Sequence, residues 1–106
     1  MIISIISKEY WVKIVEFLQQ NWALIEKKDE TSKVIVYFIS DTSGVFDTLE
    51  FESKREAEES LLKNRFKKYL DPNENFTEFL YPPQPPFEWR DHPNGAIYSS
   101  GRYWIS

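Results

Sequence analysis

The hydrophobic and polar positions change their period at Ser53, and the clearest unit of the chain lies on either side of that residue. Before it, residues 45–52 alternate at period two, which is typical of a strand with one face in the core. Asp47 falls on the apolar face and interrupts the alternation. One face carries Val45, Leu49 and Phe51, and the other carries Phe46, Thr48, Glu50 and Glu52. The pattern predicts a strand over about residues 45–52.

From Lys54 onwards the apolar positions recur at helical spacing. Ser53 is a suitable N-cap, and Glu56 three residues later completes the capping-box pattern S-x-x-E. Proline disfavours helical geometry at the residue before it, so Asp71-Pro72 marks an end. The apolar stripe consists of Ala57, Leu61, Leu62, Phe66, Tyr69 and Leu70. These signals predict a helix over about residues 54–70.

Two further strands precede this unit. Residues 22–28 alternate well enough for a strand, and residues 33–40 form a near-continuous run of β-branched and aromatic side chains. Such a run is typical of a central strand that is buried on both faces. Because short polar turns separate the three strands, we expect an antiparallel meander with the helix packed across it.

The first twenty residues allow two interpretations. Apolar residues recur at helical spacing after Ser7, which predicts a helix over about residues 8–20. The isoleucine pairs in residues 2–6 favour a short buried strand before it. A single helix over residues 2–20 is the competing interpretation. The helical stripe consists of Tyr10, Trp11, Ile14, Val15 and Leu18.

The C-terminal third is rich in aromatic side chains and proline. The run 82–86 contains P-x-x-P twice, so it is either a ligand for an aromatic groove or a rigid loop at the sheet edge. Its aromatic neighbours Tyr81 and Phe87 favour the packed loop. After the turn signal Asn94-Gly95, residues 96–99 and 102–105 predict two short strands.

The fold class expected from these elements is α+β. An antiparallel sheet, made of the meander at about 22–52 and the short C-terminal strands, packs against two helices at about 8–20 and 54–70. The chain of 106 residues has 42% hydrophobic and 17% aromatic residues, which indicates one globular domain, residues 1–106. The N-terminal run has neither the charge pattern of a signal peptide nor the length of a membrane span.

Charge is distributed unevenly. The net charge is −4, and residues 41–59 hold seven acids against two bases. Residues 60–70 hold four bases and no acid, an order that complements the dipole of the predicted helix. An acidic chain binds a phosphate backbone poorly, so we expect no nucleic-acid partner.

Candidate catalytic chemistry is sparse. His92 is the only histidine and lies beside Asp91, so general acid–base catalysis with nearby acids is one hypothesis. An ordinary polar loop is the alternative, and it is favoured because a lone histidine is weak evidence. The sequence contains no cysteine, no calcium-loop pattern and no phosphate-binding glycine motif. We therefore predict no catalytic residues, no metal site and no cofactor.

The acidic stretch 47–59 and the aromatic C-terminus Gly101-Arg-Tyr-Trp104-Ile give the chain a recognisable character. It resembles the small acidic immunity proteins of bacterial polymorphic toxin and contact-dependent growth inhibition systems. The resemblance implies a non-catalytic cytoplasmic protein that neutralises a cognate toxin, commonly a basic nuclease, through an acidic and aromatic surface. The partner-binding residues expected on this basis are Asp47, Glu50, Glu52, Glu56, Glu59, Trp89, Tyr98 and Tyr103.

Two other functions remain as hypotheses from the residues. One is a small nuclease-like enzyme that uses His92 and nearby acids. The other is an adaptor or self-associating domain that acts through the proline and aromatic segment. The sequence specifies no oligomeric state and does not identify a toxin.

Overall fold

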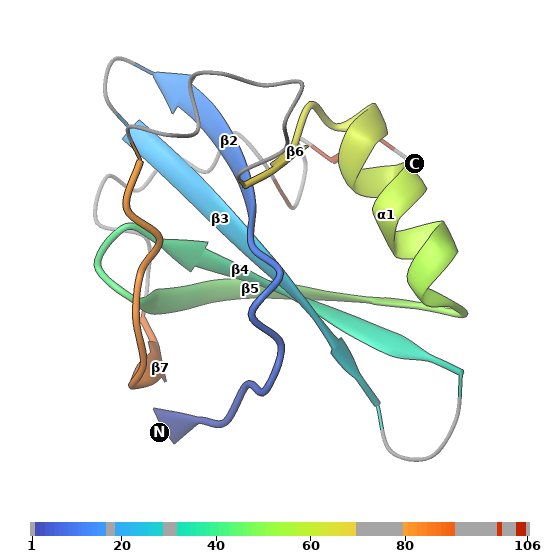
Figure 1. Ribbon diagram of the computed structural model, residues 1–106, viewed down its shortest axis with the longest axis horizontal. Helices are drawn as coiled ribbons and strands as arrows, with labels where there is room; N and C mark the ends of the chain where they lie inside the picture. Colours follow the sequence, from blue (N-terminus) through green and yellow to red (C-terminus); the bar gives the residue numbers. More distant parts are fainter. Residues whose placement is uncertain are drawn as a thin grey trace.

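One twisted sheet, with a single helix against one of its faces, makes up the described part of the chain (Figure 1). The computed structural model describes residues 2–16, 19–28, 32–69, 80–90, 100 and 104–105. Within these residues, no helix is long and apolar enough to cross a membrane. The α+β class expected from the sequence is confirmed.

The sheet has seven strands among the described residues, in the order β1-β7-β5-β4-β3-β2-β6. Neighbouring strands are antiparallel, except that β5 and β7 are parallel. The elements in chain order are β1 (Ile2–Ile3), β2 (Trp11–Glu16), β3 (Gln19–Lys27), β4 (Val34–Ser40), β5 (Gly44–Phe51), α1 (Lys54–Lys63), β6 (Lys67–Lys68) and β7 (Phe87–Trp89).

The predicted meander is confirmed as β3, β4 and β5, with β4 at the centre of the sheet. Successive side chains of a strand point to opposite faces, so a central strand contributes to two cores. The helix-side core contains Trp11, Ala23, Ile25, Val34, Val36, Phe38, Ala57, Leu61 and Phe66. The far-side core contains Val12, Trp22, Leu24, Ile39, Val45 and Phe87.

A bulge in β5 changes the faces that simple alternation predicts. Asp47 pairs with Phe38, but the next residue of β4 pairs with Val45, so Phe46 is the extra residue. As a result Val45 joins the far-side core, whereas Phe46 packs against the helix-side core with Leu49 and Phe51. The predicted grouping of Val45 with Leu49 and Phe51 was therefore wrong.

The predicted helix over residues 8–20 is wrong, and so is the alternative helix over 2–20. Residues 11–16 form β2, which pairs with β3 on one side and with β6 on the other. Trp11 and Val12 are buried in opposite cores, an arrangement that a strand allows and a one-sided helix does not. β-branched and aromatic residues fit this half-buried pleated surface better than a helix.

The helix begins where the sequence predicts. Ser53 has an extended backbone, and its hydroxyl oxygen accepts a hydrogen bond from the Glu56 amide at 3.2 Å. The buried face of α1 presents Ala57 and Leu61 to the sheet. Burying a leucine side chain contributes about 2 kcal/mol, so this contact is a principal anchor of the helix.

The helix ends at Lys63, seven residues before the predicted end. Arg65 adopts a left-handed backbone with φ of 70°, and its amide donates to the Leu62 carbonyl. The Phe66 amide donates to the Leu61 carbonyl, and the two side chains meet in the helix-side core. This pattern is a Schellman motif, in which two backbone bonds and one apolar contact close a helix.

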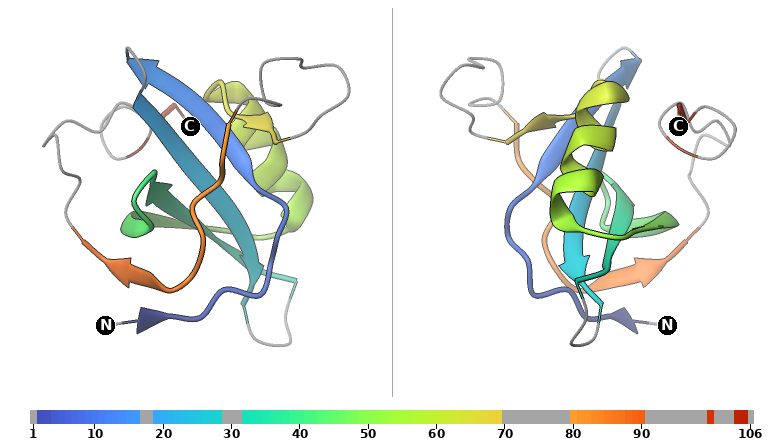
Figure 2. Two further views of the ribbon diagram at one scale, coloured as in Figure 1. Left: turned by 60° about the vertical axis from the view of Figure 1, so that its left-hand side comes forward. Right: turned by 90° about the vertical axis from the view of Figure 1, so that its right-hand side faces the viewer.

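Two extended segments cover the face of the sheet opposite α1 (Figure 2). Residues 4–10 and 80–87 bring Ile5, Tyr10 and Leu80 against the far-side core, and Ile3 of β1 packs there too. The buried strand predicted over residues 2–6 is confined to the edge strand β1, and Ile2 is 67% exposed. That part of the prediction was wrong: among the described strands, β1 is at the edge of the sheet and pairs with β7 alone.

The C-terminal strands predicted at 96–99 and 102–105 lie mostly outside the described residues. Trp104 and Ile105 are described and belong to no strand. The Trp104 ring packs on Phe38 and Phe51. Asn64 holds this segment, because its amide nitrogen donates to the Ile105 carbonyl and its oxygen accepts from the Ile105 amide.

Candidate functional site

Glu50 lies on the face of the sheet opposite α1. It stands between Leu49 and Phe51, which pack on the helix side, and it pairs with Ile35. Its carboxylate accepts a hydrogen bond from Lys28 Nζ at 2.7 Å. This bond and the Lys28 charge lower the pKa of Glu50. The negative charge of Glu50 is therefore paired with a positive charge of the same chain.

Asp47 lies on the helix side of β5, with Leu49 and Phe51, on the face that the alternation predicted to be apolar. It is opposite Phe38 in the register of β4 and β5, and it is half-buried. Its carboxylate accepts a hydrogen bond from the Thr48 amide at 2.8 Å. This acid, which is next to the β5 bulge, is therefore hydrogen-bonded to the backbone of the following residue.

Glu52, Glu56 and Glu59 are exposed around the start and the outward face of α1. Arg55 Nε donates to Glu59 at 3.1 Å, one helical turn apart, so part of the charge is paired. Leu62 lies on the same outward face and is 59% exposed. Glu59 is therefore one turn from an exposed apolar side chain, whereas Glu52 and Glu56 lie nearer the start of α1.

Trp89 lies far from these acids along the sheet. It is 45% exposed in β7 and pairs with Val45, near the start of β5, whereas Glu52 follows the end of β5. A strand of this length separates the two by roughly 20 Å. The structure therefore does not bring Trp89 together with the acids of α1. Tyr98 and Tyr103 lie outside the described residues.

Positive charge gathers at the opposite end of α1, next to β2 and β6. A hollow of about 260 Å³ is lined there by Val12, Lys13, Ile14, Arg65 and Lys67. Burial lowers the pKa of Lys13, and the neighbouring Arg65 charge lowers it further. The surface near α1 is therefore polarised, with acids around its start and bases near its end.

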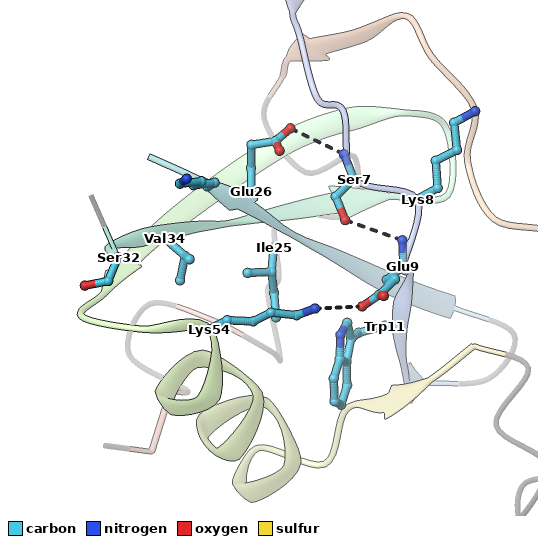
Figure 3. Close-up of a pocket in the computed structure, with 10 residues that line it drawn as sticks. Ser7, Lys8, Glu9, Trp11, Ile25, Glu26, Ser32, Val34 and Lys54 are labelled. Atoms are coloured by element: carbon cyan, nitrogen blue, oxygen red, sulfur yellow. Dashed lines mark hydrogen bonds and ion pairs between the residues drawn. The ribbon is translucent and has the colours of Figure 1, made fainter. Parts of the chain in front are cut away.

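A larger pocket of about 450 Å³ opens beside the start of α1 (Figure 3). The buried side chains Trp11, Ile25 and Val34 form its apolar part. Residues from four separate parts of the chain make its rim. The polar and charged residues lining it are Ser7, Lys8, Glu9, Glu26, Lys27, Ser32 and Lys54.

The two glutamates of this pocket already have partners. The Glu26 carboxylate accepts hydrogen bonds from the backbone amides of Ile6 and Ser7. The Glu9 carboxylate accepts from Lys54 Nζ at 3.2 Å. Sequence reasoning missed this pocket, because its parts are up to 47 positions apart (residues 7 and 54) and no local pattern connects them.

The hypothesis of catalysis at His92 falls outside the described residues. Among the residues that are described, no three His, Cys, Asp or Glu side chains gather closely enough to hold a metal ion. The described residues therefore offer two candidate surfaces, an exposed acidic helix face and a mixed apolar and cationic pocket.

Comparisons of the chain with protein-family models, with curated proteins and with solved structures gave no match. Its function must therefore be inferred from the surfaces described above.

Proposed function

We propose that this protein is a non-catalytic, cytoplasmic immunity protein that binds and neutralises a cognate bacterial toxin. The observation that carries the proposal is the outward face of α1, where Glu56, Glu59 and Leu62 are exposed and Glu59 lies one turn from Leu62. An exposed apolar side chain within a polar rim is the usual anatomy of a protein-binding surface.

This face is held rigidly, which favours binding. The N-cap at Ser53 fixes the start of α1, and the Schellman motif at Arg65 fixes its end. Ala57 and Leu61 anchor the inner side of the helix to the sheet. A surface that is already ordered loses little conformational entropy on binding, so more of the contact energy contributes to affinity.

The charge of the face supports a basic partner, such as a nuclease domain. Glu52 and Glu56 are exposed and have no salt-bridge partner among the described residues, whereas Glu50 pairs with Lys28 and Glu59 pairs with Arg55. We therefore assign the electrostatic role chiefly to Glu52 and Glu56, at the start of α1. Complementary charge accelerates association and fixes the orientation of the complex.

The alternative role as a proline-rich adaptor is less favoured by the contacts of residues 82–86. Pro83 is buried, and its carbonyl accepts a hydrogen bond from the Tyr10 hydroxyl at 2.7 Å. The Gln84 carbonyl accepts from the Ser43 hydroxyl, also at 2.7 Å. Because these bonds tie the run to the fold, a groove that binds free proline-rich tails would have to break them.

The proposal is tested by co-expression in bacteria. We expect a large secreted protein with a C-terminal toxin domain to be encoded next to this chain, and that domain is the test partner. We expect the toxin domain alone to arrest growth and this protein to restore it. The double variant Glu56→Lys/Glu59→Lys should restore growth poorly, while Glu88→Lys on β7 should act like the native protein. Growth arrest that persists despite a folded, soluble native protein contradicts the proposal.

A further inference from the structure

The pocket beside the start of α1 has the composition of a small-molecule site. Its volume of about 450 Å³ lies within the usual range for ligand pockets. Trp11, Ile25 and Val34 provide an apolar wall, and charged side chains surround the opening. This site is separate from the outward face of α1, and the inference from it does not depend on the proposed function.

The charges of the pocket favour an anionic group. Glu26 is occupied by the backbone amides of Ile6 and Ser7, and Glu9 is occupied by Lys54. Lys8 and Lys27 have no carboxylate partner among the described residues, and both are exposed at the rim. The rim therefore carries more positive charge than the pocket itself neutralises.

The indole of Trp11 supplies a second, independent feature. Trp11 is 3% exposed, and its Nε1 hydrogen is a buried donor without an acceptor among the described atoms. In Figure 3 the indole nitrogen is on the side of the ring that faces the pair formed by Lys54 and Glu9. An unpaired buried donor is unfavourable, so an acceptor placed here gains a stabilising hydrogen bond.

We infer that the pocket binds a small organic monocarboxylate with an apolar body. Its carboxylate replaces Glu9 as the partner of Lys54 and accepts the Trp11 Nε1 hydrogen bond. Its apolar body packs on Ile25 and Val34. A charge-assisted bond and burial of an apolar group then act together, which explains why the pocket combines both kinds of lining.

Phenylacetate is a suitable probe, and the indole amide signal of Trp11 in a proton–nitrogen correlation spectrum is the direct readout. We expect a saturable downfield shift of that signal, because the indole hydrogen gains an acceptor. The signals of Trp22, Trp89 and Trp104 should move little. The neutral analogue 2-phenylethanol should bind at least about tenfold more weakly, because it cannot make the charge-assisted bond.

Three variants separate this site from non-specific binding. Lys54→Gln should weaken phenylacetate binding by about tenfold or more. Arg55→Gln removes the same charge from the next residue, whose partner is Glu59, and should leave binding unchanged. Glu9→Gln removes the competing carboxylate and should tighten binding about two- to fivefold.

The inference is overturned if the Trp11 signal shows no saturable shift with phenylacetate. It is also overturned if Lys54→Gln binds phenylacetate as tightly as the native chain, or if 2-phenylethanol binds equally well. Growth protection against a toxin can fail without affecting any of these signals, so the two proposals are tested separately.

Discussion

Lys28 Nζ lies 2.7 Å from Glu50 Oε1, and the pair is on the face of the sheet that α1 does not cover. Glu50 belongs to the most acidic stretch of the sequence, but the fold provides its counter-charge from Lys28, which is 22 positions earlier and follows the end of β3. Glu56 on α1 has no such counter-charge among the described residues, so its carboxylate is more available to a partner than that of Glu50.

Replacing Lys28 by glutamine should raise the pKa of Glu50. The folded-state pKa is lowered by the Lys28 bond, so the pair stabilises the fold above the unfolded pKa of Glu50. That contribution is lost as pH falls through the lowered folded-state pKa. Titration of the glutamate carboxyl carbons by NMR measures the change. An identical Glu50 titration in native protein and Lys28→Gln contradicts the assigned cause.

Arg65→Gly should stabilise the protein by about 0.5–1 kcal/mol. Arg65 occupies the left-handed position of the Schellman motif with φ of 70°, where glycine has no steric penalty. The matched control is Arg55→Gly inside the exposed first turn of α1, which should destabilise by about 1 kcal/mol. Urea unfolding measures the change in the free energy of unfolding for each variant. A destabilised Arg65→Gly would mean that the contacts of the arginine side chain contribute more than relief of the backbone strain.

Asn64→Ala should destabilise the protein by about 2–3 kcal/mol. The buried Asn64 side chain makes hydrogen bonds to both backbone groups of Ile105, at 2.9 and 2.7 Å. Its loss leaves these groups unpaired and releases the segment that holds Trp104 on Phe38. Gln84→Ala removes an exposed amide and should change stability by less than about 0.5 kcal/mol. Equal unfolding midpoints for the two variants refute the role of Asn64.

The central strands could be predicted because their side chains strongly favour extended over helical structure. The run that forms β4 has aromatic and β-branched side chains on both faces, and the polar turns around it allow only short connections. Ser53 followed by Glu56 is a local capping signal, so the start of α1 was also predictable. Such features depend on neighbours along the chain and need no knowledge of tertiary contacts.

The misassigned elements depend on contacts between distant residues. The spacing of Trp11, Ile14 and Val15 suits a helix, but this segment forms a strand because its backbone pairs with β3 and β6. The end of α1 was missed because Arg65, and not glycine, adopts the left-handed conformation. Tertiary packing of Phe66 stabilises that turn and overrides the local preference.

The candidate site was predictable only in part for the same reason. The exposure of Glu56 and Glu59 follows from helical periodicity, so their place on the outward face could be expected. The pairing of Glu50 with Lys28 depends on how the strands associate, which the sequence does not state. The pocket requires contact between residues as distant as Glu9 and Lys54.

The most direct test of the account is the association rate of this protein with its proposed toxin partner, measured by stopped flow at low and high salt. Glu56→Lys and Glu50→Lys change the net charge equally, but only Glu56 lies on α1. We predict that Glu56→Lys slows association several-fold at low salt and that added salt diminishes the difference, because salt screens exposed charges. Glu50→Lys should have a much smaller effect. Equal slowing by both variants, or no slowing by Glu56→Lys, would contradict recognition through the acidic face of α1.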